Sequence, residues 1–342
     1  MCEGHDGLHP HEPGHPHDHP TTLDRRSLLG LAAAGLGGIL LASCRSGVGT
    51  ATTSTSPESR VTSSEVEVSS ETLAGFEAFA DSVKVFRDGQ FWMVESNGIP
   101  DHNMMVGIKS WQQQFPLPQP YSGSNAWQIP TTPTKAEAPI SARTALYRGA
   151  IALAVNGVPI FNALNNRGDD AFLAGELDEW GGHCGRADDY HYHVAPLHLQ
   201  EKTGNKPIAY ALDGYPIYGS TEPDGSAVLA LDEWNGHADE SGGYHYHGTT
   251  TYPYINGGLV GVVRVSGDQI EPQAVTKPFR PPGEPLRGAT ITGFRSPQTN
   301  HYELEYSLDG TSLSVEYVVD GSSVTFTFSN GAGVTRTETY TR

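Results

Sequence analysis

Histidine occurs twice in this chain with the same spacing, His-x7-His-x-His. The first copy lies in the phrase LDEWGGHCGRADDYHYH from Leu177, and the second in LDEWNGHADESGGYHYH from Leu231. The six residues concerned are His183, His191, His193, His237, His245 and His247. Imidazole nitrogen is a good ligand for zinc, copper, iron or nickel, and three of them can form a metal site. The spacing therefore predicts transition-metal binding, with copper or zinc as the expected ion.

The Tyr-His-Tyr-His segments must be positioned by β-strands for this chemistry. Side chains alternate between the faces of a strand, so His191 and His193 point one way while Tyr190 and Tyr192 point the other. Two residues of strand rise about 7 Å, which lets both imidazoles reach one ion, joined by a third histidine from the preceding loop. The tyrosines are then expected in the core. The sequence leaves open whether the two copies share one site, although a twofold arrangement predicts one common cleft.

Other side chains near these phrases are candidates for the same site. His102, in ESNGIPDH, is a candidate ligand or a contact to a ligand. Cys184 is either a fourth ligand or a buried, inert thiol. The pairs Asp178-Glu179 and Asp232-Glu233 can orient an imidazole or act as a general base, or they can be solvated loop residues.

Three functions fit these residues. The first is metal binding. The second is a metal-dependent enzyme, a hydrolase or oxidoreductase that uses the same site. The third is a cell-surface binding module, in which the histidines and tyrosines form a buried polar network and Trp127, Trp180 and Trp234 provide a platform for sugar or peptide. The chain has no GxSxG, phosphate-binding glycine loop or HExxH motif, and its net charge of −18 argues against nucleic acid as a partner.

The N-terminal region resembles an export signal. Residues 1–43 combine a histidine-rich start, the pair Arg25-Arg26 and a short apolar run, as in a twin-arginine signal. Cys44 follows Leu-Ala-Ser, as in a bacterial lipobox, and is the predicted lipidation site. Residues 44–72 are rich in Ser and Thr and predict a flexible linker. We therefore expect an extracytoplasmic protein, in the periplasm or at the cell surface, whose only membrane attachment is this lipid anchor.

The rest of the chain predicts a mainly β fold, with a β-rich α+β fold as the alternative. Residues 73–285 are expected to form one domain containing an internal repeat, 157–193 and 214–247, whose copies open with the hairpin phrases NGVPIFN and DGYPIYG. Residues 286–342 contain short apolar runs separated by Asp-Gly and Asn-Gly, which predicts an antiparallel meander. The sequence does not indicate an oligomeric state.

Several of these phrases together resemble a known family. YHYH at 190 and 244, ESNGIPDH from Glu95 and YHYHGTTTYPYINGGLVG from Tyr244 are similar to the YHYH-domain proteins, which are often exported bacterial proteins. The resemblance spans roughly Phe91 to Phe294. It implies a shared architecture for that region and brings no established reaction with it.

Overall fold

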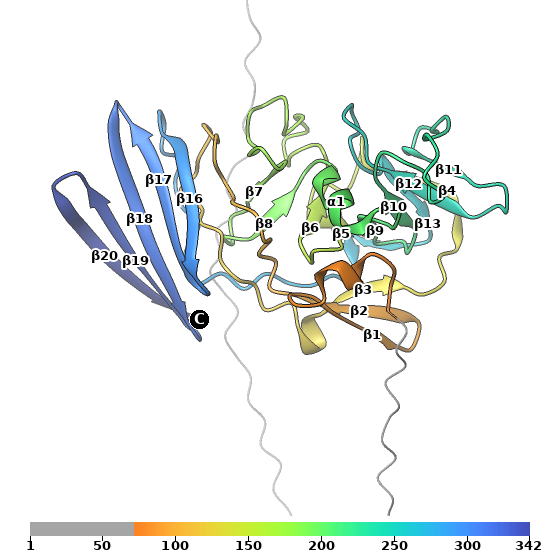
Figure 1. The fold of residues 1–342 in the computed structure, drawn as a ribbon, viewed down its shortest axis with the longest axis horizontal. Coiled ribbons are helices and arrows are strands. Elements are labelled where there is room, and N and C mark those ends of the chain that lie inside the picture. Colours follow the sequence, from red (N-terminus) through yellow and green to blue (C-terminus); the bar gives the residue numbers. More distant parts are fainter. Residues whose placement is uncertain (1–71) are drawn as a thin grey trace, which may run out of the picture. The chain divides into compact units, whose positions relative to one another are not determined.

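The computed structural model describes residues 72–342, which form a mostly β structure (Figure 1). The predicted mainly β fold class is confirmed. No helix in this part of the chain is long and apolar enough to cross a membrane. The helices are η1 (Phe76–Phe79), η2 (Gly123–Asn125), η3 (Leu197–Leu199) and α1 (Gln200–Thr203). The predicted signal over 1–43, the lipidation site Cys44 and all of the 44–72 linker except its last residue lie outside the described residues.

The strands form five sheets within residues 72–342. A three-stranded sheet contains β1 (Lys84–Asp88), β2 (Phe91–Glu95) and β3 (Trp127–Pro130). Two small sheets pair β4 (Lys135–Ser141) with β13 (Gly258–Gly261), and β14 (Arg264–Ser266) with β15 (Gln269–Glu271). The largest sheet contains β5 (Ala150–Ala154), β6 (Pro159–Phe161), β7 (Gly182–Cys184), β8 (Tyr190–Tyr192), β9 (Ala209–Ala211), β10 (Pro216–Tyr218), β11 (Gly236–Ala238) and β12 (Tyr244–His247). The fifth contains β16 (Thr290–Gln298), β17 (His301–Leu308), β18 (Thr311–Asp320), β19 (Ser323–Asn330) and β20 (Gly333–Thr341).

The eight-stranded sheet has a symmetric order, β11-β12-β10-β9-β5-β6-β8-β7. β5 and β9 pair antiparallel at its centre, and each continues through a hairpin into β6 or β10. β6 then pairs parallel with β8, and β10 pairs parallel with β12. The set β5–β8 therefore has the same order and directions as the set β9–β12. Descent of the two sets from an internal duplication stays a prediction.

The centre of this sheet consists of small and apolar residues. β5 has the sequence AIALA and β9 has AYA, and every one of their residues is buried. Strands buried on both faces are expected to lack polar alternation, as these do. The two hairpins that follow turn at Gly157 and Gly214, whose φ angles are 81° and 94°. Such positive φ angles favour glycine, which explains the predictive Asn-Gly and Asp-Gly signals.

The C-terminal meander is confirmed as the five-stranded antiparallel sheet β16–β20. Its strands are not hydrogen-bonded to the eight-stranded sheet. Side chains connect the two regions: the Tyr317 hydroxyl donates to the carbonyl oxygen of Pro116, and Phe115 packs against Phe326 with ring centroids 5.0 Å apart. The segment around Phe115 lies between β16 and β7 in Figure 1. It links the meander to the hairpin that carries the first histidines.

Candidate metal centres

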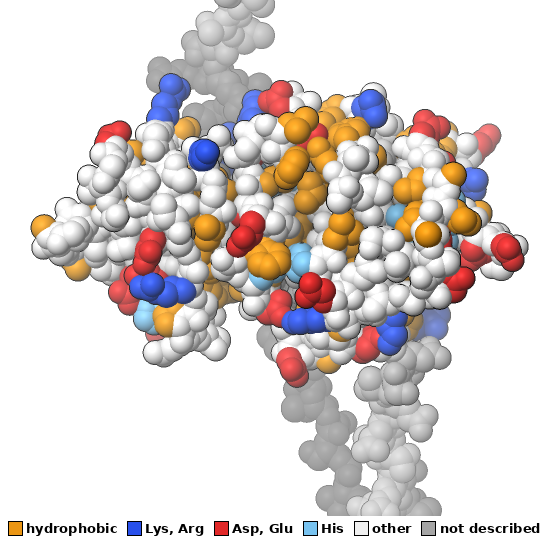
Figure 2. Space-filling model, turned by 45° about the horizontal axis from the view of Figure 1, so that its top comes forward, with side chains coloured by type: hydrophobic (Ala, Val, Ile, Leu, Met, Phe, Trp, Pro, Cys, Tyr) orange, Lys and Arg blue, Asp and Glu red, His pale blue; other side chains and the backbone are white. Residues whose placement is uncertain are grey.

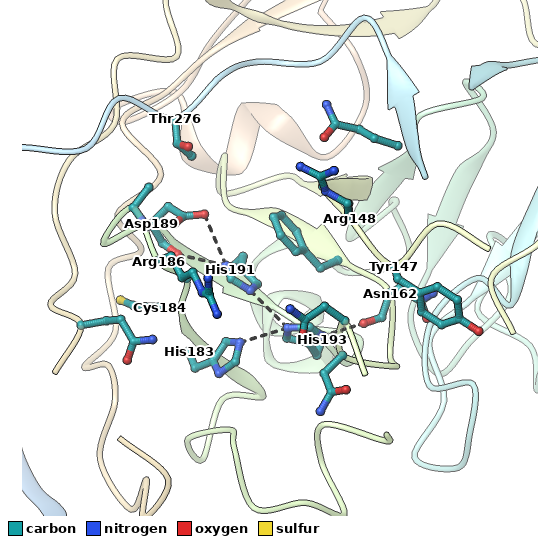
Figure 3. A pocket seen from close by; sticks show the side chains of 18 of the residues that line it. Tyr147, Arg148, Asn162, His183, Cys184, Arg186, Asp189, His191, His193 and Thr276 are labelled. Atoms are coloured by element: carbon teal, nitrogen blue, oxygen red, sulfur yellow. Dashed lines mark hydrogen bonds and ion pairs between the residues drawn. The ribbon is translucent and has the colours of Figure 1, made fainter. Parts of the chain in front are cut away.

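The hairpin of β7 and β8 brings the first three histidines together. His183 on β7 lies directly opposite His191 on β8, and His193 follows just after the strand. Nε2 of His193 lies 3.1 Å from Nε2 of His183 and 3.1 Å from Nε2 of His191. Figure 3 shows the three rings turned toward one another. We call these residues the first cluster, and their nitrogens are close enough together to hold one metal ion.

The second ring nitrogens determine where the protons of this cluster lie. Nδ1–H of His191 donates to the carbonyl oxygen of Asp189 at 2.9 Å, and Nδ1–H of His193 donates to the carbonyl oxygen of Asn162 at 2.5 Å. A carbonyl oxygen only accepts, so each neutral ring presents a lone pair at Nε2. Two lone pairs 3.1 Å apart repel each other unless a cation lies between them. Histidine ligands commonly donate their other N–H to a carbonyl oxygen in this way.

Burial keeps two of these rings neutral. Removal from water, together with the neighbouring His191, lowers the pKa of His193 to about 3. Burial and the two neighbouring imidazoles lower the pKa of His183 well below its usual range. Both rings are therefore unprotonated at pH 7, which is the form that coordinates metal.

The hairpin of β11 and β12 builds a second cluster, in which a carboxylate joins three histidines. His237 lies opposite His245, and Nε2 of His237 lies 3.3 Å from Nε2 of His247. Glu222 reaches Nε2 of His237 at 3.0 Å through Oε1, and Nε2 of His245 at 3.1 Å through Oε2. Nδ1–H of His247 donates to the carbonyl oxygen of Gly219 at 3.0 Å. The four side chains form one group able to hold a metal ion, and four is the usual coordination number of structural zinc.

Glu222 is the residue of this cluster that the sequence analysis missed. Burial alone would raise the pKa of its carboxyl, but hydrogen bonds from the Leu229 N–H and from His245 bring the pKa below its ordinary value. The carboxylate is thus ionised at neutral pH. The first cluster has Asn165 at the equivalent position, because Asn165 and Glu222 each accept an N–H from a glycine three residues later in the same kind of turn. Aligning the two repeats would have revealed this difference.

The six histidines do not share one cleft. Within residues 72–342 they form two separate groups, and the hairpins that carry them, β7–β8 and β11–β12, lie at the two opposite edges of the eight-stranded sheet. The prediction of a common cleft is therefore wrong. The central pairing of β5 with β9 causes this result, because it directs the two histidine hairpins outward to opposite edges.

His102 joins neither cluster, which corrects its prediction as a ligand. Its Nε2 lies 2.7 Å from the hydroxyl of Tyr192, and its ring stacks on Trp180 with centroids 4.7 Å apart. Tyr192 lies on the face of β8 opposite to His191, so His102 packs on the tyrosine side. Cys184 lies opposite Tyr190 on that same side, and burial raises the pKa of its thiol well above the usual value. Neither residue contributes a ligand atom to the first cluster.

The aspartate of each acidic pair shapes the turn before the histidines. Asp178 accepts the N–H groups of Trp180 and Gly182 and the hydroxyl proton of Tyr190. Asp232 likewise accepts hydrogen bonds from Trp234, Gly236 and Tyr244. These aspartates therefore fix the hairpins and do not contact the imidazoles. As predicted, the tyrosines serve packing, with Tyr190, Tyr192 and Tyr246 buried in the core.

A cavity of about 470 Å³ opens beside the first cluster (Figure 3). All three of its histidines line the cavity, and Phe161 stacks on His191 with ring centroids 3.9 Å apart. A volume of this size is within the range of small-molecule sites. The first cluster therefore combines three ligands with access to a space that can admit a further molecule.

Comparison with known families identifies part of this region. Residues 126–229 match the model of the YHYH protein family, so this part of the chain is a YHYH domain, as the motifs predicted. The match contains the first cluster and Glu222 and ends before His237. No curated protein and no solved structure matches the chain.

Proposed function

We propose that this YHYH-domain protein binds two transition-metal ions, one in each histidine cluster. The observation that carries the proposal is the meeting of Nε2 atoms of neutral imidazoles, those of His183 and His193 at 3.1 Å. In a tetrahedral site with zinc–nitrogen bonds of about 2.0–2.1 Å, neighbouring ligands are about 3.3 Å apart. The nitrogen–nitrogen distances of 3.1 Å in the first cluster and 3.3 Å in the second are close to this value.

Zinc is the ion that we favour, with copper as its competitor. Three imidazoles, or three imidazoles and a carboxylate, are ligand sets that zinc accepts in four-coordinate sites. Copper(II) binds nitrogen ligands more tightly than zinc does, so copper fills the clusters wherever it is available. Comparison of the two ions in one preparation decides between them.

The deciding experiment counts metal ions in the purified full chain and in two paired variants. Dialysis against zinc or copper, followed by elemental analysis, is expected to give about two equivalents for the parent protein. His191→Ala/His193→Ala and His245→Ala/His247→Ala are each expected to retain one. The proposal fails if the parent protein binds less than about a tenth of an equivalent of either metal while its circular dichroism shows a folded protein.

Export and lipid anchoring belong to the same proposal. The support is the pair Arg25-Arg26, the apolar run and the lipobox-like sequence before Cys44. A protein held in this way outside the cytoplasm binds metal in the periplasm or at the cell surface. The test is fractionation: Cys44→Ala is expected to move the exported protein from the membrane to the soluble fraction, and replacement of both arginines by lysine is expected to block export.

A metal-dependent enzyme is the second candidate, and the cavity beside the first cluster favours it. Three protein ligands leave a fourth position for water, whose pKa zinc lowers to about 7 in hydrolytic sites. Hydrolysis of ester and phosphoester substrates is the screen. Activity that His191→Ala/His193→Ala removes and His245→Ala/His247→Ala retains would establish it, and equal loss in both variants would exclude it.

The aromatic platform of the third candidate receives little support. Trp127 is 2 % exposed. Trp180 stacks on His102, and Trp234 packs against the core. Figure 2 shows acidic and basic side chains dispersed over one face, with only small areas of histidine. These three tryptophans therefore do not form the exposed planar array that a sugar or peptide platform requires.

A further inference from the structure

Two arginines at the cavity beside the first cluster have no ion-pair partner among the described residues. Arg148 and Arg186 both line the cavity and are exposed, and neither is within salt-bridge distance of a carboxylate. Arg167, which also lines it, differs because Asp169 and Glu176 hold its guanidinium. Two positive charges thus remain available at the opening.

These charges stand out in an acidic protein. The chain has a net charge of −18, and the position equivalent to Arg186 in the β11–β12 turn is Glu240. The remaining acidic groups at the cavity are already engaged: Asp189 accepts the Ala187 N–H, and Glu176 binds Arg167. The charge at the rim is therefore positive at the first cluster and negative at the corresponding place of the second.

Polar groups continue around the cavity wall. Gln112 and Gln269 line it, and Phe161 covers one face of His191. Amide groups and an aromatic ring suit the polar body of a small organic molecule, while guanidinium groups bind carboxylate or phosphate through paired hydrogen bonds. Metal held by the three histidines adds a further positive charge at the cavity floor.

From these features we propose that the cavity binds an oxyanion, a carboxylate or phosphate group of a small molecule, between the metal of the first cluster and Arg186, with Arg148 at the entrance. This inference rests on the proposed metal site. The anion occupies the coordination position that the three histidines leave open. In the second cluster Glu222 supplies that negative ligand from the protein itself, so we expect no exogenous anion there.

Cobalt(II) is a suitable probe, because its visible absorption changes when a ligand enters an open position. The full chain with His245→Ala/His247→Ala isolates the first cluster. This protein, loaded with cobalt, is titrated with inorganic phosphate, acetate and imidazole. Phosphate and acetate distinguish the two oxyanion sources, and imidazole is a neutral ligand that needs the metal but not the arginines.

Arg186→Gln is expected to weaken phosphate or acetate binding about tenfold or more, and Arg148→Gln to weaken it less, while both leave imidazole binding unchanged. Glu240→Gln is the matched control at the equivalent turn and is expected to change neither anion binding nor imidazole binding. The proposal is overturned if imidazole changes the spectrum but both anions do not, or if the arginine variants weaken imidazole and anions equally. Absence of bound cobalt would instead refute the metal site itself.

Discussion

The two histidine clusters are built on the same hairpin but differ in what surrounds it. In both, the strand pairing is identical, with His183 opposite His191 and His237 opposite His245. The first cluster has three nitrogens, an adjoining cavity and a turn in which Asp188 and Asp189 are buried beside the segment at Phe115. The second has a fourth, anionic side chain, that of Glu222, and an exposed turn.

This contrast shows which part of the chemistry the hairpin determines. The hairpin brings three imidazoles together, because opposite residues share a face and so does the histidine two residues further along the chain. The clusters differ at one residue of the preceding turn, Asn165 or Glu222, and we propose that this residue decides whether a bound metal keeps an open position. The same local structure can therefore support a filled structural site and an accessible one in a single sheet.

The largest predicted effect concerns the turn between β7 and β8, whose Asp188 is buried. Arg280 lies 2.7 Å from Asp188 in that turn, and both side chains are nearly buried. Arg280→Ala leaves a buried carboxylate without its partner, so we expect about 3–5 kcal/mol of lost stability, measured by urea unfolding. Zinc affinity should fall at the first cluster and remain at the second.

The control for this change is Arg264→Ala, which removes an exposed arginine 3.8 Å from Glu271. We expect less than about 1 kcal/mol from it. Equal effects of the two substitutions would contradict the view that the first turn alone is anchored by a buried ion pair.

The next prediction uses pH to compare Asp178 with Asp232. Burial raises the pKa of Asp178 to about 6, whereas Asp232 is exposed. Between pH 4 and 6 the folded state keeps the proton that the unfolded state releases, so this group's contribution to stability falls as the pH rises through that window. The loss totals roughly 3 kcal/mol.

Asp178→Asn removes that titration. The stability of the parent protein relative to this variant, from unfolding curves at pH 4 and pH 7, should therefore be greater at pH 4. Asp232→Asn, at the exposed equivalent position, is the control for disturbance of the hydrogen bonds that the aspartate makes to its turn. If the stability difference between the parent protein and Asp178→Asn is the same at pH 4 and pH 7, the Asp178 carboxyl is not buried as described.

The sequence predicts the Asn-Gly and Asp-Gly hairpins and the histidines of each cluster because both depend on local rules. Period-two alternation separates His191 from Tyr190, and Asn-Gly or Asp-Gly turns specify the hairpins and the C-terminal meander. These features require only neighbouring residues.

The features that the sequence does not predict depend on contacts between distant segments. The separation of the clusters follows from the pairing of β5 with β9, two alanine-rich strands whose spacing reveals no partner. His102 packs against Tyr192, 90 residues away in the chain. Glu222 lies 23 residues before His245, and only the turn after β10 brings its carboxylate back to the cluster.

A single exchange of side chains should convert one type of cluster into the other. Glu222→Gln removes the anionic ligand and is expected to lower zinc affinity at the second cluster about 10–100-fold, by analogy with losses from changes around metal ligands. Asn165→Glu places a carboxylate at the equivalent turn of the first cluster. We expect tighter zinc binding there and loss of imidazole binding to cobalt, since the open position becomes filled.

Both exchanges are measured by competition with a zinc-binding dye, each in the background that retains one cluster. Asn166→Gln, at the exposed neighbouring position, is the control for disturbance of the turn. If Asn165→Glu leaves imidazole binding intact, the carboxylate does not reach the ion, and the proposed equivalence of the two turns is incorrect.

The smallest predicted effect distinguishes the carboxylates next to the middle histidines. Asp189 Oδ2 lies 3.7 Å from Nδ1 of His191 and is almost fully buried, whereas Asp239 lies near His245 in an exposed turn. Nδ1–H of His191 donates to the backbone carbonyl, so the Asp189 carboxylate acts through its charge alone. Asp189→Asn should therefore lower the zinc affinity of the first cluster by less than about tenfold. Loss of a partner that is hydrogen-bonded directly to a metal ligand costs about 10–100-fold. Asp239→Asn should weaken the second cluster still less, because water screens an exposed charge. A larger effect at Asp239 than at Asp189, measured by the same dye competition, would contradict the greater influence of the buried aspartate beside the first cluster.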